Sequence, residues 1–188
     1  MAKSMIHADV DSKAVLYAFK QLPKELQAEI RKHNREDSDK LAMAIRTDAH
    51  AGGVPPQAAL IADSGAVVAR TDRTIRVDVG GKKLVKNKAS MDENGKFRKE
   101  YRANKKTGKS RLQRIGTPAG ALVWGATDGS SGKPTDRSGR KMGRRFVLGH
   151  SQRGYWLQPT TEAWVETLLP KWKRRVQSAV ERSRHGVS

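Results

Sequence analysis

Lysine and arginine are the side chains of this protein most able to bind a partner. Together they number 38, against 19 aspartates and glutamates, which gives a formal net charge of +19 at neutral pH. Such an excess predicts partners that carry negative charge, such as nucleic-acid phosphates or acidic protein surfaces. Only 36% of the residues are hydrophobic, so we expect part of the chain to lie outside any packed core.

The groups that usually carry catalysis or hold metals lack the required spacing. There is no cysteine, which excludes a disulfide scaffold, a thiolate zinc site and a cysteine nucleophile. The five histidines form no His-x-His or His-x-x-x-His pair. Residues 107–110 are similar to the end of a phosphate loop, but Ala103 stands where that loop needs its first glycine. We therefore expect no enzyme, no cofactor and no metal site, and a hydrolase with an unrecognised site is the enzymatic alternative.

The positive charge is concentrated in two segments, residues 82–118 and 127–145. From Lys82 to Arg114 there are thirteen lysines and arginines and only three acidic residues. Two interpretations stay open: basic loop insertions that are solvated in an ordinary domain, or arms that become ordered on a partner. The candidate contact residues of the first segment are Lys82, Lys83, Lys86, Lys88, Lys96, Arg98, Lys99, Arg102, Lys105, Lys106, Lys109, Arg111 and Arg114. Those of the second segment are Arg137, Arg140, Lys141, Arg144 and Arg145.

Aromatic residues add two further possibilities. Phe97 and Tyr101 lie within the first basic segment, where they are able to stack on bases while lysines and arginines neutralise phosphates. No known nucleic-acid reading motif is present, so this alternative takes the form of nonspecific binding. Tyr155, Trp156 and Trp164 are candidates to anchor the last helix, either in the core of one subunit or between subunits.

The elements that position these segments follow from hydrophobic periodicity. We expect a short strand at residues 5–10 and a long helix from Lys13 to about Gly52. Pro23 either starts a second segment of that helix or bends it. The polar middle of the helix, residues 33–40, has the weakest helical pattern. Residues 57–63, which follow two prolines, predict a short helix.

Strands and a second long helix are expected in the rest of the chain. Residues 66–70 and 75–79 predict paired strands, residues 119–124 a third strand, and residues 146–148 a strand fragment. Near the C-terminus, apolar residues step by four at Trp164, Leu168, Trp172, Val176 and Val180. This spacing predicts a helix that kinks or breaks at Pro170, restarts there and stops near Gly186. The outline is one α+β domain, residues 1–188, with a long N-terminal helix, a small antiparallel sheet and a C-terminal helix.

The order of these elements resembles a known family, the small tail-completion or head–tail joining proteins of long-tailed bacteriophages, which includes the minor tail protein Z type. Residues 16–26, with their leucine-proline step, resemble the family's opening helix. Residues 44–64 resemble its helix end, proline pair and short helix. Residues 121–125 and 154–159 resemble its aromatic-glycine strand end and its aromatic-leucine-x-proline entry into the last helix. The resemblance covers about 110 to 120 residues, which are the framework without the two insertions.

This resemblance implies a structural virion component rather than an enzyme. It implies a homo-oligomeric ring, with a hexamer favoured, around the DNA channel of the neck or tail end. The expected partners are further copies of the chain and other neck and tail proteins, with nonspecific DNA contact possible. We expect a protein made in the bacterial host cytoplasm and found in the virion. No apolar run approaches the roughly 20 residues of a membrane span, and residues 1–6 lack the apolar stretch of a secretory signal.

Overall fold

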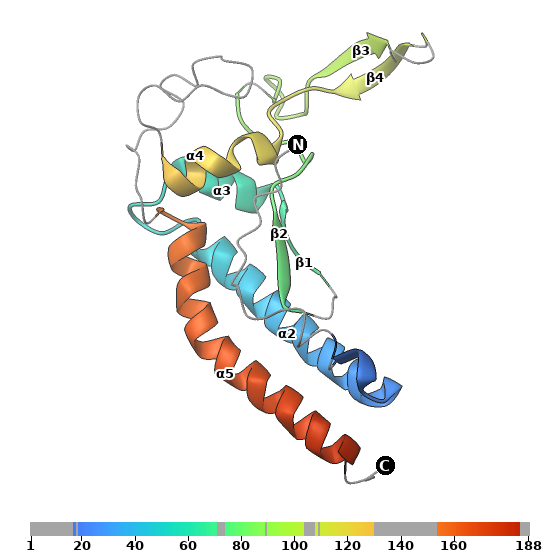
Figure 1. Ribbon diagram of the computed structural model, residues 1–188. Helices are drawn as coiled ribbons and strands as arrows, with labels where there is room; N and C mark the ends of the chain where they lie inside the picture. The colour runs from blue at the N-terminus through green and yellow to red at the C-terminus, as the bar shows by residue number, and fades with distance from the viewer. Residues whose placement is uncertain are drawn as a thin grey trace.

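The structure is a computed structural model that describes residues 17, 19–70, 74–88, 90–103, 108, 110–129 and 154–184. Two long helices lie side by side and form an elongated body, with short helices and a small sheet packed toward one end (Figure 1). The expected strand at residues 5–10, the helix start at Lys13, the strand fragment at residues 146–148 and the helix stop near Gly186 lie outside the described residues. The architecture of helices with small antiparallel sheets confirms the α+β prediction.

The first long helix, α2, spans Lys24–Asp48. Pro23 precedes it with a ψ of 149°, which is not helical, so this proline separates α2 from the helical turn before it. The polar middle is helical because its buried face carries polar residues that find partners. Ser38 donates its hydroxyl to the carbonyl of Asn34 at 2.7 Å and accepts the N–H of Arg76 at 2.9 Å.

The predicted short helix and strand pair are both present. Helix α3 spans Pro56–Asp63, and strands β1 (Val67–Arg70) and β2 (Arg76–Val79) pair in antiparallel fashion. Arg35 and Arg46 of α2 donate to the carbonyls of Ala69 and Val67 at 3.2 and 2.6 Å. These bonds join the free edge of β1 to α2, and that edge would otherwise expose unpaired carbonyls.

The predicted third strand at residues 119–124 is wrong. These residues form the 3-10 helix η1, Ala119–Ala121, and the start of α4, Val123–Asp128. Ala119, Leu122 and Ala126 are buried, which is a helical spacing. A short apolar run does not by itself distinguish a strand from a buried helix, and the contacts with α3 select the helix.

The predicted restart of the C-terminal helix at Pro170 is also wrong. Helix α5 runs from Leu157 to Arg184 with Pro170 inside it, and Figure 1 shows one curved helix. Buried residues lie on either side of the proline, and α5 packs along α2. This packing keeps the helix continuous across the proline in spite of the missing N–H and the crowded turn.

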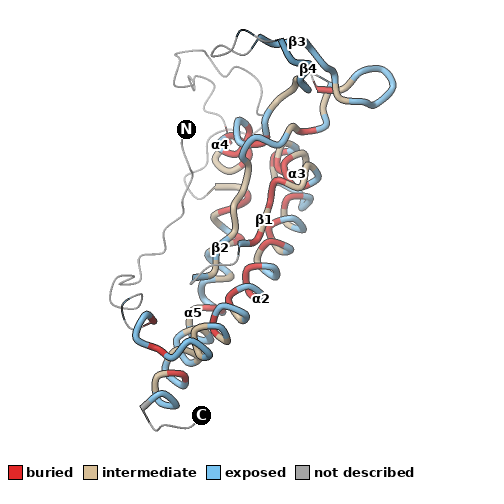
Figure 2. Tube along the Cα trace, turned by 90° about the vertical axis from the view of Figure 1, so that its right-hand side faces the viewer, coloured by how far each residue is buried: buried red, intermediate tan, exposed pale blue. Residues whose placement is uncertain are grey.

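Among the residues that the structure describes, two hydrophobic clusters stabilise the body. The larger one joins the C-terminal half of α2 to α3, β1, α4 and the start of α5, with Trp156 and Ile45 among its members. The smaller one lies near the other end of the helix pair, where Phe19, Leu22 and Ile30 meet Ala179. Figure 2 shows the buried positions as a red stripe along α2, facing β1 and α5. The segment after β2 contributes Val85 to the larger cluster and then leaves the body.

Candidate functional site: the β3–β4 hairpin

The first basic segment is fastened to the body at its root. Ala119 donates its N–H to the carbonyl of Lys83 at 2.7 Å, and Val85, which is fully buried, donates to the carbonyl of Thr117 at 3.0 Å. The ammonium group of Lys83 lies 2.6 Å from the carbonyl oxygen of Gly65, in the turn after α3. The chain therefore leaves and re-enters the body at adjacent points.

Beyond this root, a buried serine and a small turn lead to the hairpin. The hydroxyl of Ser90 accepts the N–H of Thr117 at 3.0 Å, and the carbonyl of Ser90 accepts the N–H of Arg98 at 3.0 Å. The Oδ1 atom of Asp92 accepts two backbone N–H groups, those of Asn94 and Lys96, at 3.0 and 2.8 Å. These bonds give the basic segment regular local structure at its base.

The segment then forms an antiparallel hairpin of β3 (Lys99–Ala103) and β4 (Ser110–Arg114). Every residue of both strands is exposed. Figures 1 and 2 show the hairpin projecting from the end of the body where α3 and α4 lie. These strands were not predicted from the sequence, because each carries only one large apolar residue, Tyr101 or Leu112, and the strict alternation that marks a half-buried strand is missing.

The two faces of the hairpin differ in chemistry, since directly opposed residues of an antiparallel pair point to the same side. On one side Lys99 is opposite Arg114, and Tyr101 is opposite Leu112. The guanidinium of Arg114 also lies 5.6 Å from the centre of the Phe97 ring. We call this the aromatic face, consisting of Phe97, Lys99, Tyr101, Leu112 and Arg114.

The other side carries Arg102 opposite Arg111 and Glu100 opposite Gln113. We call it the arginine face, consisting of these four residues. Its one acidic group, Glu100, lies 3.7 Å from the guanidinium of Arg102. Because both side chains are more than half exposed, this ion pair contributes little to stability.

The hairpin is electrostatically unfavourable as an isolated structure. Two of its five cross-strand pairs, Lys99–Arg114 and Arg102–Arg111, oppose cation to cation. Like charges directly opposite each other destabilise a sheet, and a two-stranded hairpin without a buried face is marginal in water. A negatively charged partner on the aromatic face would relieve the Lys99–Arg114 repulsion and cover the exposed Tyr101 and Leu112. The geometry therefore favours an anionic binding partner for this element.

The candidate contact residues fall into three groups in the structure. Ten of the first segment are exposed at the hairpin or its base, namely Lys82, Lys83, Lys86, Lys88, Lys96, Arg98, Lys99, Arg102, Arg111 and Arg114. Eight lie outside the described residues, namely Lys105, Lys106, Lys109, Arg137, Arg140, Lys141, Arg144 and Arg145. The aromatic candidates belong to the body: Trp156 is buried in the core of its own subunit, and Tyr155 and Trp164 are half-buried.

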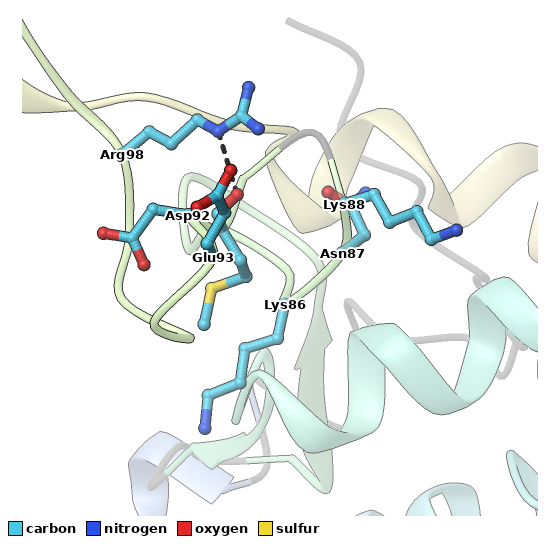
Figure 3. A pocket seen from close by; sticks show the side chains of 7 residues that line it. Lys86, Asn87, Lys88, Asp92, Glu93 and Arg98 are labelled. Atoms are coloured by element: carbon cyan, nitrogen blue, oxygen red, sulfur yellow. Dashed lines mark hydrogen bonds between the residues drawn. The ribbon is translucent and has the colours of Figure 1, made fainter.

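A hollow of about 450 Å³ lies at the base of the hairpin, with Lys86, Lys88, Asp92, Glu93 and Arg98 among its lining residues. Arg98 donates its Nε–H to the carbonyl of Met91 at 2.8 Å, shown as the dashed line in Figure 3. Figure 3 also shows Lys86, Lys88 and Glu93 pointing in three different directions. These side chains do not converge on a common point, and the arrangement gives no acid–base pair aimed at a substrate.

The described part of the chain holds no group of three or more histidine, aspartate or glutamate side chains arranged to bind a metal ion. In the same residues, no helix combines the length and the apolar character needed to cross a membrane. Comparison of the chain with models of known protein families, with curated proteins and with solved structures found no match.

Proposed function

We propose that this protein is a structural component of a bacteriophage neck or tail end, and that it acts by assembling into a ring around the DNA channel. The β3–β4 hairpin serves as an arm that reaches a neighbouring protein in that assembly. The single observation that carries this proposal is the hairpin itself, which projects from the body, is exposed along both strands and opposes like charges. The particle is suggested by the resemblance of residues 16–26, 44–64 and 154–159 to the tail-completion family, whereas residues 121–125, which resemble a strand end of that family, are helical in this chain.

The shape of the subunit supports assembly through unlike surfaces. The hairpin lies at one end of the elongated body and the C-terminal half of α5 lies at the other (Figure 1). An arm at one end contacts a different surface on the next copy, which is a heterologous contact. Such contacts produce closed rings or open helical filaments. A short projecting arm also adds contact area between subunits without requiring a larger hydrophobic core.

The aromatic face supports one alternative function, nonspecific nucleic-acid binding. Cations beside the exposed ring of Tyr101 match the combination of phosphate neutralisation and base stacking that single-stranded nucleic acids require. This alternative predicts tight DNA binding by a free subunit, with an affinity that falls steeply as salt rises.

A hairpin truncation distinguishes assembly from a free DNA-binding function. Ile115 donates its N–H to the carbonyl of Arg98 at 2.9 Å, so these two residues are already held as a hairpin closure. Replacing residues 99–114 with a two-residue Asn-Gly turn removes both strands and leaves the base intact. We expect the truncated chain to unfold at the same urea concentration as the full chain, because the strands contribute no buried residue.

Electron microscopy and sedimentation of both chains then test the proposal. We expect the full chain to form a ring of defined subunit number and the truncated chain to remain monomeric. A full chain that is monomeric at every concentration and absent from virions would contradict the proposal. Loss of salt-sensitive DNA affinity on truncation, with no ring in either chain, would favour the alternative.

A further inference from the structure

The first half of α5 differs in charge from the rest of this basic chain. From Leu157 to Leu169 it contains two glutamates and no lysine or arginine, whereas residues 170–184 contain six lysines and arginines and one glutamate. The helix dipole favours acidic residues only within about the first turn. Glu162 and Glu166 come five and nine residues after Leu157, the first residue of α5, so the dipole does not account for them.

These glutamates lie on the side of α5 that faces away from α2. Leu157, Thr160 and Leu168 are buried, Glu162 and Glu166 lie on the opposite side of the helix, and Leu169 and Val165 lie beside the glutamates, between them and the buried side. We call these four residues the acidic stripe. Both glutamates are exposed, Val165 is 39% exposed and Leu169 is half-buried. The stripe is therefore a pair of carboxylates beside two aliphatic side chains, accessible from solvent.

The acidic stripe and the aromatic face are complementary. The stripe carries two carboxylates at positions i and i+4, whose Cβ atoms are about 6 Å apart. The aromatic face carries Lys99 opposite Arg114, whose Cβ atoms are about 5 Å apart. Each surface also has an apolar pair next to its charges, Val165 and Leu169 on α5 and Tyr101 and Leu112 on the hairpin.

Each surface contains a repulsion that the other one would relieve. Glutamates four residues apart on a helix destabilise it, and so do cations directly opposite each other in a hairpin. Bringing the two surfaces together replaces two like-charge pairs with two opposite-charge pairs. It also covers Tyr101, which is 76% exposed, and Val165.

We infer that the aromatic face of one copy docks on the acidic stripe of the next copy. This inference rests on the proposed function and names the partner surface of the arm. The hairpin and the first half of α5 belong to different parts of the subunit (Figure 1). Each copy therefore has one donor surface and one acceptor surface, and repetition of the contact closes a ring or extends a filament.

Charge reversal in the full-length chain tests the pairing. Glu162→Lys/Glu166→Lys reverses the stripe, and Lys99→Glu/Arg114→Glu reverses the aromatic face. We expect either pair of changes alone to raise the concentration needed for assembly by about tenfold or more. The four changes in one chain restore the opposite charges, so we expect assembly to return to within about threefold of the original.

The arginine face supplies the matched control. Arg102→Glu/Arg111→Glu makes the same change of charge on the same hairpin, but on the side that does not meet the stripe. We expect its combination with the reversed stripe to show no restored assembly. Circular dichroism and thermal unfolding verify that each variant is folded. If the Glu162→Lys/Glu166→Lys variant does not fold, Glu162→Gln/Glu166→Gln is used in its place.

The outcomes separate this inference from the proposed function. If the original chain never assembles, both fail. If the original chain assembles through the hairpin but reversing the charges of the acidic stripe does not change that assembly, only this inference is overturned. The same holds if the chain with all four changes is folded and stays monomeric. If Lys99→Glu/Arg114→Glu removes DNA binding and reversal of the stripe does not change assembly, the hairpin holds nucleic acid and the inference is likewise overturned.

Discussion

The indole N–H of Trp156 donates a hydrogen bond of 2.8 Å to the carbonyl oxygen of Ile45, 111 residues earlier in the chain. This bond joins the start of α5 to the end of α2. One turn later, the hydroxyl of Thr160 lies 2.7 Å from a carboxylate oxygen of Asp48 and 2.8 Å from the carbonyl of Trp156. The two long helices are thus held together by specific polar contacts at the end from which the hairpin projects.

The Trp156 contact predicts that replacing its indole with a phenyl ring lowers the stability of the protein substantially. Trp156→Phe removes the donor and leaves space in a core where Trp156 is only 1% exposed. We expect the free energy of unfolding, measured with urea, to fall by about 2–3 kcal/mol. Trp124→Phe is the matched control because Trp124 is 62% exposed, and its effect should stay within about 0.5 kcal/mol. Equal effects of the two substitutions would contradict the placement of Trp156 in the core.

A second prediction concerns the ion pair between α2 and α5. Arg175 Nη1 lies 2.5 Å from Asp37 Oδ2, and the side chain of Asp37 is 5% exposed. Arg175→Ala leaves a buried carboxylate without this partner, which should cost about 2 kcal/mol, less than for a fully buried pair because Arg175 is 32% exposed. The adjacent Arg174→Ala is the control, since Arg174 is exposed and donates only a 3.4 Å bond to the carbonyl of Pro170. Urea unfolding of both variants checks the difference.

Gly120 provides a third prediction, which tests the helical structure at residues 119–124. Its N–H donates to the carbonyl of Gly81 at 3.0 Å, and a Cβ added to Gly120 would lie 2.9 Å from the backbone nitrogen and oxygen of Gly81. Backbone atoms cannot rotate away, so we expect Gly120→Ala to destabilise the protein by about 1–3 kcal/mol. Gly52→Ala has nothing within 4 Å of the added Cβ and should be neutral or slightly stabilising. A thermal shift with both variants measures this contrast.

The carboxyl group of Asp78 in β2 predicts a loss of stability in acid. Burial by itself would raise the pKa of Asp78, but hydrogen bonds from Arg70 and Arg76 outweigh burial and lower the pKa below its usual value. A carboxyl whose pKa is lowered by folding stabilises the folded state above its unfolded pKa, and this contribution disappears as pH falls through the folded value. We therefore expect the melting temperature to fall between about pH 5 and pH 2.

Two substitutions identify the share of Asp78 in that pH dependence. Asp78→Asn removes the titrating group, so the slope of melting temperature against pH should become shallower. Arg70→Gln removes the donor that lies 2.8 Å from Asp78 Oδ2, and should also make the slope shallower while leaving the carboxyl in place. A slope that is unchanged in both variants would show that Asp78 does not contribute. The pKa of Glu29, lowered chiefly by its hydrogen bond from Arg182, adds to the same trend in the original chain.

Much of the framework could be predicted because local patterns agree with the final fold. The two long helices, the short helix after the proline pair and the β1–β2 strands each have apolar residues at the spacing of their own structure. The polar middle of α2 is helical because Asp37 and Ser38 lie on its buried side, where Arg175 of α5 pairs with Asp37 and the backbone N–H of Arg76 in β2 donates to Ser38. Their partners are distant in sequence, so local pattern alone gave a weak indication there.

Residue types and their order along the chain determine that this protein is strongly basic, that much of its positive charge lies in residues 82–114, and that its ordered framework is built around two long helices. Those properties depend on residue type and on spacing within one element. Tertiary structure decided that residues 119–124 are helical, that α5 passes through Pro170, and that the basic segment forms a hairpin with an aromatic face and an arginine face. These depend on which surfaces are available for packing and on which residues oppose each other across strands. Such contacts join positions far apart in the chain, and no local pattern encodes them.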